Sequence, residues 1–377
     1  MSDGTARACG GAGGMSDGTA RACDRCLSRS WLLARLAGHL DLVRARIEPV
    51  LGLGDEELVA AVAGKQRDPV LRELSALDAG ELRRAARSAR LEALCRCDPE
   101  YPARLALTPS PPAVLHVTGG LERFLELVAG EPVAIVGARR ASAYGLEIAR
   151  SLGQGLGCAG ITVLSGMALG IDSAAHAGAL AAGAGTVAVL PGGADRAYPP
   201  SRGTLLRRIK AQGGAVSELP PGSSARRWAF PARNRIIAGL SAMTVVVEAG
   251  ERSGALLTAA FAGELHRPLG AVPGLVSAPL ASGPLRLLAD GAQLVRGAQD
   301  VLDQLYGAGA RSAPGVERGE LALELRVLLA AIAEGNDTAA SLARAGFAAE
   351  RCLGALASLE LAGYVRHAPG GRFVVVP

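Results

Sequence analysis

The sequence predicts an α/β protein built on a doubly wound parallel sheet, and three observations lead to this fold class. Short β-branched runs recur, beginning with Val133–Val136 and Ile161–Leu164, and each is followed by a glycine turn and a helical pattern. The strand–helix units then repeat as far as Val272, which favours right-handed parallel crossovers. The chain is 49% hydrophobic but only 3% aromatic, so we expect a large aliphatic core.

Composition and periodicity divide the 377 residues into five parts. The predicted parts are a disordered tail with a duplicated MSDGTARAC start (1–28), a helical bundle (29–97), a Rossmann-like sheet domain (98–306), a Gly/Ala/Ser/Pro linker (307–316) and a winged-helix domain (317–377). The third helix of the last part, about Ala349–Ala362, carries one arginine and two glutamates. This charge favours a protein-contact or dimerisation role over reading of a DNA groove.

The sheet domain should present its ligand site at one edge. Its expected strands are Ala113–Val117, Val133–Val136, Ile161–Leu164, Thr186–Leu190, Ala215–Glu218, Met243–Val247 and Leu269–Val272. Ligands of doubly wound folds lie outside the carboxyl ends of the strands. The glycine turns that follow the strands expose backbone N–H groups at helix N-termini, where anions bind. The helix after Gly170 should be capped by Asp172.

Several functional classes are not favoured by the sequence. It has no run of 18 apolar residues and no signal peptide pattern, so we expect a soluble cytosolic protein that contacts no membrane. The seven cysteines include two close pairs, Cys23 with Cys26 and Cys95 with Cys97. Neither pair has a partner pair at the spacing of a zinc ribbon, so the sequence predicts no metal and no disulfide framework.

The motifs of nucleotide enzymes are likewise missing or misplaced. A GxGxxG pattern at Gly155, Gly157 and Gly160 follows a helix and precedes a strand, the reverse of a dinucleotide fingerprint. The only lysines, Lys65 and Lys210, do not lie in a Walker A motif. Asp172, His176 and the serines near them lack a nucleophile elbow. We therefore expect no catalytic residue and no cofactor.

Arginines instead gather where the ligand edge is expected. Residues 131–310 hold 16 basic and 11 acidic side chains, which accounts for the whole net charge of +5. Five arginines fall in the turns of this edge or in the loop that leads to it: Arg139, Arg140, Arg202, Arg233 and Arg235. Phe230 and Tyr198 lie beside them and could stack on bases or simply pack. The excess charge alone is ordinary, but with these turns it favours binding of a nucleic-acid strand.

Long ordered motifs in this domain resemble one known family. They are VAIVGARRASAYG, VLSGMALGIDSAAHAGAL, YPPSRGTL, FPARNRIIAGLS and VVVEAGERSGALLTAAFA, after a DPEYP and SPPAVLHVTG lead-in. Over about 98–305 the chain is similar to the DNA-processing protein A family (DprA, Smf). The resemblance implies an extended Rossmann-like domain that binds single-stranded DNA and forms a homodimer. It also implies a SAM-like N-terminal domain, a winged helix, and loading of the recombinase RecA for homologous recombination in natural transformation by competent cells.

The resemblance assigns roles to particular residues. Gly137 and Arg139 look like the turn that grips phosphate, and Ser165 with Gly166 like a second amide turn. The basic pocket and the last helix start would be formed by Arg233, Asn234, Arg235, Ser253 and Gly254. The chain departs from the family at Pro200 and Arg202, where the family often has Lys and Asn, and at Pro284, where it prefers a small polar residue.

Two other hypotheses about the function remain open. The chain could be a nucleotide-binding enzyme or sensor on the same type of sheet, with Gly192, Gly193 and Glu248 framing a mononucleotide. It could also be a scaffold that acts through its winged helix, in which case loss of 311–377 would abolish function while DNA binding survived. Preference for oligonucleotides over mononucleotides, together with steep salt dependence, separates a strand binder from the first of these.

Overall fold

The structure, a computed structural model, describes residues 21–312, 321–361 and 364–375. The chain divides into two compact units, Met1–Ala313 and Pro314–Pro377, and each is described by itself. Most of the predicted tail lies outside the described residues. Its boundary was wrong, because helix α1 begins at Asp24, inside the segment expected to be disordered.

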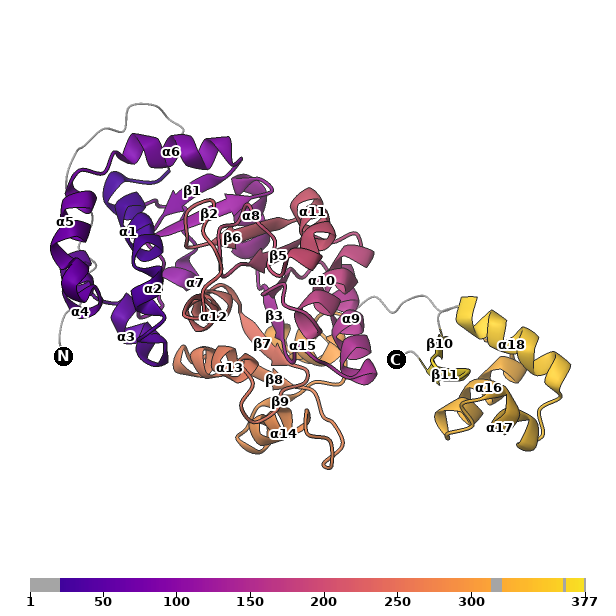
Figure 1. Cartoon of the computed structure of the whole chain (residues 1–377). Coiled ribbons are helices and arrows are strands. Elements are labelled where there is room, and N and C mark those ends of the chain that lie inside the picture. The colour runs from indigo at the N-terminus through magenta and orange to yellow at the C-terminus, as the bar shows by residue number, and fades with distance from the viewer. Residues whose placement is uncertain (1–20, 313–320, 362–363, 376–377) are drawn as a thin grey trace. The chain divides into compact units, whose positions relative to one another are not determined.

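Within 21–312 the strands form one nine-stranded sheet in the order β1-β2-β6-β5-β4-β3-β7-β8-β9 (Figure 1). All neighbours from β6 to β9 are parallel, while β2 is antiparallel to both β1 and β6. The strands are β1 (Glu92–Cys95), β2 (Val114–Thr118), β3 (Val133–Val136), β4 (Val163–Ser165), β5 (Thr186–Val189), β6 (Gly214–Ser217), β7 (Met243–Val246), β8 (Leu269–Ala271) and β9 (Gln293–Leu294). The predicted doubly wound sheet is confirmed, with β1 and β9 added.

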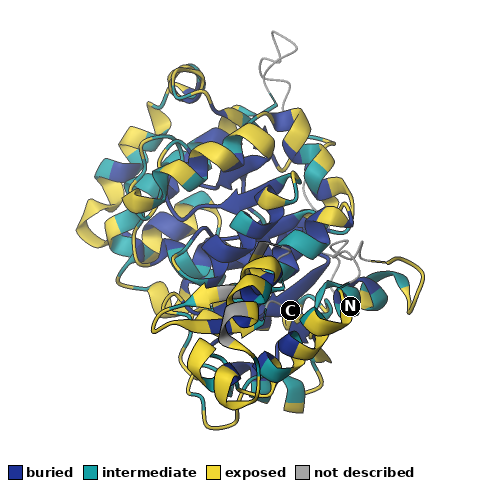
Figure 2. Cartoon of the chain, turned by 90° about the vertical axis from the view of Figure 1, so that its right-hand side faces the viewer, coloured by how far each residue is buried: buried dark blue, intermediate teal, exposed yellow. Residues whose placement is uncertain are grey.

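Helices cover both faces of this sheet. They are α7 (Ala103–Ala106), α8 (Leu121–Ala129), α9 (Ala143–Cys158), α10 (Ile171–Ala181), η3 (Pro200–Arg202), α11 (Gly203–Gln212), α12 (Ala229–Leu240), α13 (Ala255–Glu264), α14 (Ser282–Ala289) and α15 (Ala298–Tyr306). Along β3, Val133 and Ile135 join the core under α9, α10 and α15, whereas Ala134 and Val136 join the core under α8, α12 and α13. This alternation is the period of two of a strand with both faces buried, and Figure 2 shows the buried strands between partly exposed helices.

Glycines allow α9 and α10 to pack closely. A Cβ added at Gly153 would lie 2.3 Å from the Ala175 carbonyl oxygen, and one at Gly178 would lie 2.0 Å from that of Arg150. The GxGxxG pattern belongs to this region, since Gly155 and Gly157 lie inside α9. Its interpretation as something other than a dinucleotide motif is confirmed.

The helical N-terminal part packs directly on the sheet domain. Its helices are α1 (Asp24–Arg35), α2 (Ala37–Leu40), η1 (Arg44–Arg46), α3 (Ile47–Leu51), α4 (Asp55–Val62), η2 (Gly64–Gln66), α5 (Arg67–Ser75) and α6 (Ala79–Ser88). Leu32, Leu36 and Leu58 share one core with Leu219 and Trp228 of the sheet domain. The boundary predicted at residue 97 was wrong, because α6, the last helix of this part, ends at Ser88 and is followed by β1 of the sheet.

The second unit holds three helices and a hairpin: α16 (Leu323–Ala333), α17 (Ala339–Arg344), α18 (Ala349–Leu361), β10 (Val365–Ala368) and β11 (Arg372–Val375). Leu328, Leu342, Leu356 and Phe373 form its core. These are the elements that the sequence predicts for a winged helix. No helix in the described ranges is long and apolar enough to cross a bilayer.

Candidate functional site

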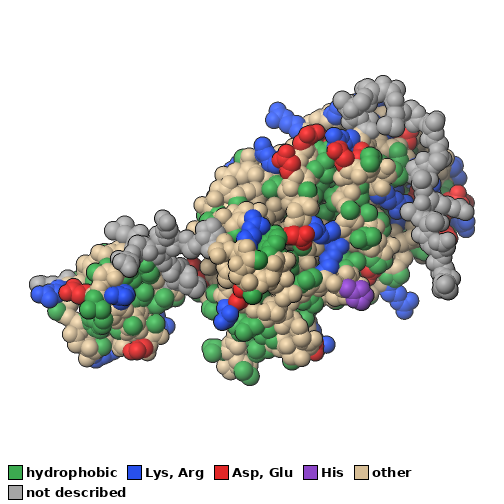
Figure 3. Space-filling view, turned by 180° about the vertical axis from the view of Figure 1, so that it is seen from behind, with side chains coloured by type: hydrophobic (Ala, Val, Ile, Leu, Met, Phe, Trp, Pro, Cys, Tyr) green, Lys and Arg blue, Asp and Glu red, His purple; other side chains and the backbone are tan. Residues whose placement is uncertain are grey.

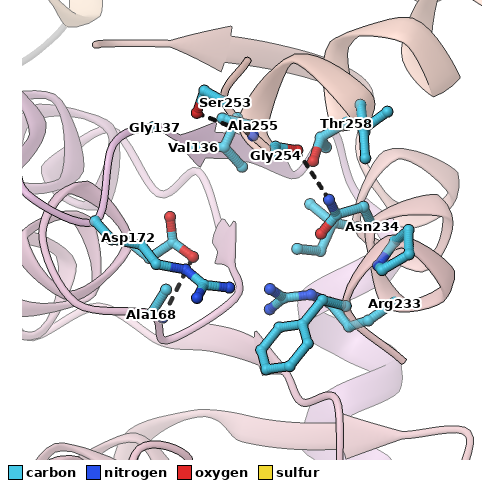
Figure 4. A pocket seen from close by; sticks show the side chains of 15 residues that line it. Val136, Gly137, Ala168, Asp172, Arg233, Asn234, Ser253, Gly254, Ala255 and Thr258 are labelled. Carbon is cyan, nitrogen blue, oxygen red and sulfur yellow. Dashed lines mark hydrogen bonds between the residues drawn. The ribbon is translucent and has the colours of Figure 1, made fainter. Parts of the chain in front are cut away.

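A pocket of about 390 Å³ lies at the point where the strand order reverses, between β3 and β7. It is lined by turns and helix starts: Val136, Gly137, Arg139, Ala168, Asp172, Phe230, Pro231, Arg233, Asn234, Ile237, Ser253, Gly254, Ala255, Leu257 and Thr258. Figure 4 shows Asp172 of α10 and Ala168 of the preceding turn on one side of this switch-point pocket and residues of α12 and α13 on the other. The pocket thus lies where doubly wound folds bind their ligands.

Arg233 is held in the wall of this pocket although it is buried. Its Nη1 donates to the Val189 carbonyl oxygen at 2.7 Å, while Nε has no hydrogen-bond partner among the described residues. Burial lowers the pKa of Arg233 to about 10, opposed by the Asp172 carboxylate and reinforced by Arg139, so the side chain stays charged near neutral pH. A Cβ at Gly166 would lie 1.7 Å from Nη1 of Arg233, so a side chain at this position would have to displace the guanidinium.

Asp172 faces Arg233 across the pocket (Figure 4). Its Oδ2 accepts hydrogen bonds from the Gly166 and Ala168 N–H groups, at 3.2 and 3.3 Å. Burial raises the pKa of Asp172, and the nearby Arg233 guanidinium opposes that shift. The carboxylate therefore holds the β4–α10 turn rather than capping α10, whose N-cap is Gly170, and the predicted capping role was wrong.

A carboxylate of the chain also accepts a backbone N–H group in the turn after β3. Glu248 Oε2 accepts from the Ser142 N–H at 2.9 Å, and Oε1 accepts from Ser142 Oγ at 2.5 Å. Ser142 Oγ in turn accepts from the Gly145 N–H and so caps α9. Glu248 thus has a structural role at the start of α9. Both turns that were expected to offer bare N–H groups to phosphate already hold a negative side chain.

A second hollow of about 590 Å³ lies beside the pocket and shares Arg139 with it. Five arginines line this arginine groove: Arg139, Arg140, Arg150, Arg202 and Arg208. Among the residues that the structure describes, no acidic side chain lines it. On the face drawn in Figure 3, by contrast, basic and acidic side chains lie among each other. The groove is therefore a local concentration of positive charge.

Aromatic rings lie where the two hollows meet. The Arg139 guanidinium lies over the Phe230 ring, 4.9 Å from its centroid, in a cation–π arrangement. Tyr198 meets Phe230 edge to face with 5.2 Å between centroids, and its side chain is partly exposed. The same rings can offer a flat apolar surface to a base.

The structure brings most of the predicted site residues together. Gly137, Arg139, Arg233, Asn234, Ser253 and Gly254 line the pocket, while Arg140 and Arg202 line the groove. Gly166 lies against the guanidinium of Arg233. Asn234 Nδ2 donates to the Gly254 carbonyl oxygen at 3.0 Å and so joins α12 to the start of α13.

Two of the predicted residues do not reach the site. Ser165 is fully buried and donates from Oγ to the Ile135 carbonyl oxygen at 2.6 Å. Arg235 is buried in an ion pair with Glu218, with 2.6 Å between Nη2 and Oε1. Both side chains lie in the core, because neighbours along β4 and α12 point to different sides of each element.

Sequence reasoning missed Arg150 and Arg208, which line the groove from the helices α9 and α11. Arg150 lies at a helical spacing from the residues at the start of α9. This spacing could have placed Arg150 on the side of the helix that faces the expected ligand site. Among the described residues, one group of at least three side chains lies close enough to hold a metal ion. It consists of four cysteines, and none of them lines the pocket or the groove.

Comparison with known proteins gives a consistent result. The family model described as DNA recombination-mediator protein A matches residues 92–306. The Protein Smf of Synechocystis sp. is 36% identical over 276 residues, which cover 73% of this chain and 68% of that protein. The putative DNA processing protein DprA of Mycobacterium tuberculosis is 41% identical over 258 residues, 67% of this chain and 66% of that protein. The chain thus spans about two thirds of the length of these relatives.

Two solved structures are also similar to this chain. The X-ray structure of DNA processing protein A from Streptococcus pneumoniae aligns with a TM-score of 0.61 and 30% identity, over 75% of this chain and 98% of that one. A DNA processing protein A structure from Helicobacter pylori aligns with a TM-score of 0.51 and 27% identity, over 57% of this chain and 95% of that one. The latter structure is described by its single-stranded DNA binding mode.

Proposed function

This chain belongs to the DNA recombination-mediator protein A family, whose named relatives are DprA and Smf proteins, and we propose that it binds single-stranded DNA. The strand would follow the arginine groove and reach the switch-point pocket past Arg139. The observation that carries this proposal is the groove itself, in which five arginines face one hollow with no acidic side chain in its lining. A connected row of guanidinium groups suits a row of phosphates.

The pocket would receive one nucleotide of the strand. Phe230 supplies a ring beside Arg139, and Arg233 supplies a charge fixed by the Val189 carbonyl oxygen. Stacking on aromatic rings accepts any base, which suits a protein that binds strands without regard to sequence. Because Asp172 and Glu248 already hold the two amide turns, guanidinium groups rather than backbone N–H groups would contact the phosphates.

We expect no catalytic turnover at this site. The pocket lining includes no histidine, cysteine or lysine, and its one carboxylate, that of Asp172, is engaged by two backbone N–H groups. The competing nucleotide enzyme or sensor would need Gly192, Gly193 and Glu248 around a mononucleotide. None of the three lines the pocket, and Glu248 binds Ser142 instead.

The decisive experiment is competition. A fluorescent oligo-dT of about 20 nucleotides is bound to the full chain, and dTMP, dATP and oligo-dT of increasing length compete for it. If the chain binds strands, longer oligonucleotides should displace the probe at low concentrations. Mononucleotides should need concentrations that are higher by orders of magnitude. Displacement by a mononucleotide as efficient as by the oligonucleotide would contradict the proposal and favour the nucleotide enzyme or sensor.

The proposal extends to two protein partners expected from the family. The chain would form a homodimer through the sheet domain and would load RecA onto bound strands during natural transformation. Light scattering of the full chain and of residues 21–312 tests the dimer and its location. RecA filament formation on single strands coated with single-stranded-DNA-binding protein, with and without this chain, tests the loading. A monomer at micromolar concentration, or loading at an unchanged rate, would contradict the respective part.

A further inference from the structure

Four cysteines from two distant segments meet on the side of the sheet that carries β1. Cys23 and Cys26 lie at the start of α1, and Cys95 and Cys97 lie at the end of β1 and in the turn after it. Their four sulfur atoms all lie within 4.8 Å of one another. From the sequence, no partner pair was expected for either pair of cysteines. In the fold the two pairs lie together, although about 70 residues of chain separate them.

The spacing of the sulfur atoms matches a single tetrahedral ion. Four thiolates at about 2.3 Å from a central zinc ion lie about 3.8 Å from each other. Cys26 Sγ and Cys97 Sγ are 3.7 Å apart, and all six separations stay below 4.8 Å. A disulfide would need about 2.05 Å between two sulfur atoms, which is much shorter than the 3.7 Å between Cys26 Sγ and Cys97 Sγ. An iron–sulfur cluster would hold the four sulfur atoms on different iron atoms and therefore farther apart.

The surroundings are suited to negative thiolates. The Cys23 N–H donates toward Cys95 Sγ at 3.5 Å, the kind of outer hydrogen bond that metal-bound sulfur accepts. Cys23 is the N-cap of the 12-residue helix α1, so the thiols lie at the positive end of that helix. Arg25 and Arg96 line one hollow together with Cys26 and can offset the charge of a four-thiolate site.

We propose that Cys23, Cys26, Cys95 and Cys97 bind one Zn²⁺ ion in a structural site. All four positions are protein ligands, so the ion would keep no open position for substrate. Cys26 and Cys95 are buried and Cys97 is exposed, which leaves the ion shielded on one side and accessible from the other.

The ion would join the first helix to the edge of the sheet. Next to the four cysteines, the Cys95 N–H donates to the Arg21 carbonyl oxygen at 3.0 Å, and a small apolar cluster includes Ala22 and Val114. Because Cys95 pairs with Val114 in the ladder of β1 and β2, the ion would fix α1 and β1 to one another.

The first test is metal content. The full chain, purified in reducing buffer without chelator, should contain about one zinc per chain by plasma mass spectrometry. Cys26→Ser and Cys95→Ser should each lose most of it. Cys158→Ser, which changes an exposed cysteine at the end of α9, is the matched control and should keep it. Equal zinc content in Cys95→Ser and wild type, or none in wild type after zinc is added, would overturn the proposal.

A second measurement does not depend on the folding of variants. Wild-type chain exchanged with Co²⁺ should show thiolate-to-metal charge transfer in the near ultraviolet and the visible bands of a tetrahedral ion, both abolished by an excess of Zn²⁺. An octahedral Co²⁺ spectrum would overturn the proposal. So would an intact mass and thiol titration that show the four cysteines joined in disulfides in freshly reduced and desalted protein.

Discussion

The switch-point pocket and the arginine groove share Arg139 but hold their other charges in different ways. In the pocket, Arg233 is 7% exposed, bound to a carbonyl oxygen and balanced by Asp172. In the groove, four further arginines line a hollow that has no acidic member. The difference favours a structural role for the charge of Arg233 and, under the proposed function, a DNA-binding role for the arginines of the groove. Loss of charge should therefore reduce stability in the pocket and DNA affinity in the groove.

The largest effect is expected from Arg233→Ala. The change leaves Asp172 buried without its opposite charge, so the free energy of unfolding should fall by about 3–5 kcal/mol. Urea unfolding followed by circular dichroism measures it. Arg233→Met combined with Asp172→Asn removes both charges and should recover a large part of the loss. Unchanged stability in the single variant would show that the pocket charge is not structural.

The next effect concerns the groove. Arg139→Ala with Arg140→Ala removes two cations and the cation–π contact to Phe230, so affinity for oligo-dT should fall about 100-fold, equivalent to about 2.7 kcal/mol. The urea midpoint should stay close to that of wild type. Arg72→Ala, which removes an exposed charge from α5, is the matched control and should bind as wild type does. Equal losses in both proteins would indicate only a general charge effect.

A change of pH separates stability from DNA affinity, because arginine does not titrate near neutrality, whereas a histidine that is buried in the folded chain does so once unfolding exposes it. Burial lowers the pKa of His176 to about 3 and that of His116 to about 4. Both values lie below that of an unfolded histidine, so stability is complete above pH 6.5 and is lost as the pH falls below it. At pH 5 each histidine should cost about 2 kcal/mol.

The urea midpoint at pH 7.5 and 5.0 measures this loss. Oligo-dT affinity over the same range should change little while the chain stays folded. His116→Gln, which can keep the hydrogen bond to Ser30 Oγ, should show about half of the pH dependence. A midpoint that rises on acidification would contradict the neutral, buried state of the two histidines.

The smallest effect is expected at the far side of the groove. Arg208→Ala removes one phosphate contact, so affinity should fall only several-fold at low salt, and the slope of log K against log salt should shrink by about 0.7. Fluorescence anisotropy across a salt series measures both quantities. An unchanged slope would show that the strand does not contact Arg208. The DNA-binding part of the groove would then be limited to the region of Arg139.

The sequence was sufficient for the sheet because its strands are short apolar runs ended by glycine turns, and β3 has the bounds that its pattern indicates. It failed at β1, since a single edge strand next to a helical pattern carries little periodicity of its own. It also could not show that Leu32 and Trp228 belong to one core, because that contact spans nearly 200 residues.

For the site, residue type and position after a strand identified Arg139 and Asn234. They could not tell Arg233 from Arg235, two neighbours on α12 of which one reaches the pocket and the other pairs with Glu218. Nor could they show that Glu248 occupies the start of α9 or that four cysteines converge. Each of these depends on which distant residue is placed opposite, which only the folded chain determines.

The central claim is that the groove arginines contact a strand of phosphates. Its most direct test is the affinity for oligo-dT of about 20 nucleotides across a salt series, for wild type and for a variant in which Arg139, Arg140, Arg202 and Arg208 are all changed to alanine. We predict a wild-type slope near −3.5, as five phosphate contacts require, and a slope of only about −0.7 in a folded variant, which keeps one of the five contacts. Equal slopes in the two proteins would contradict the account.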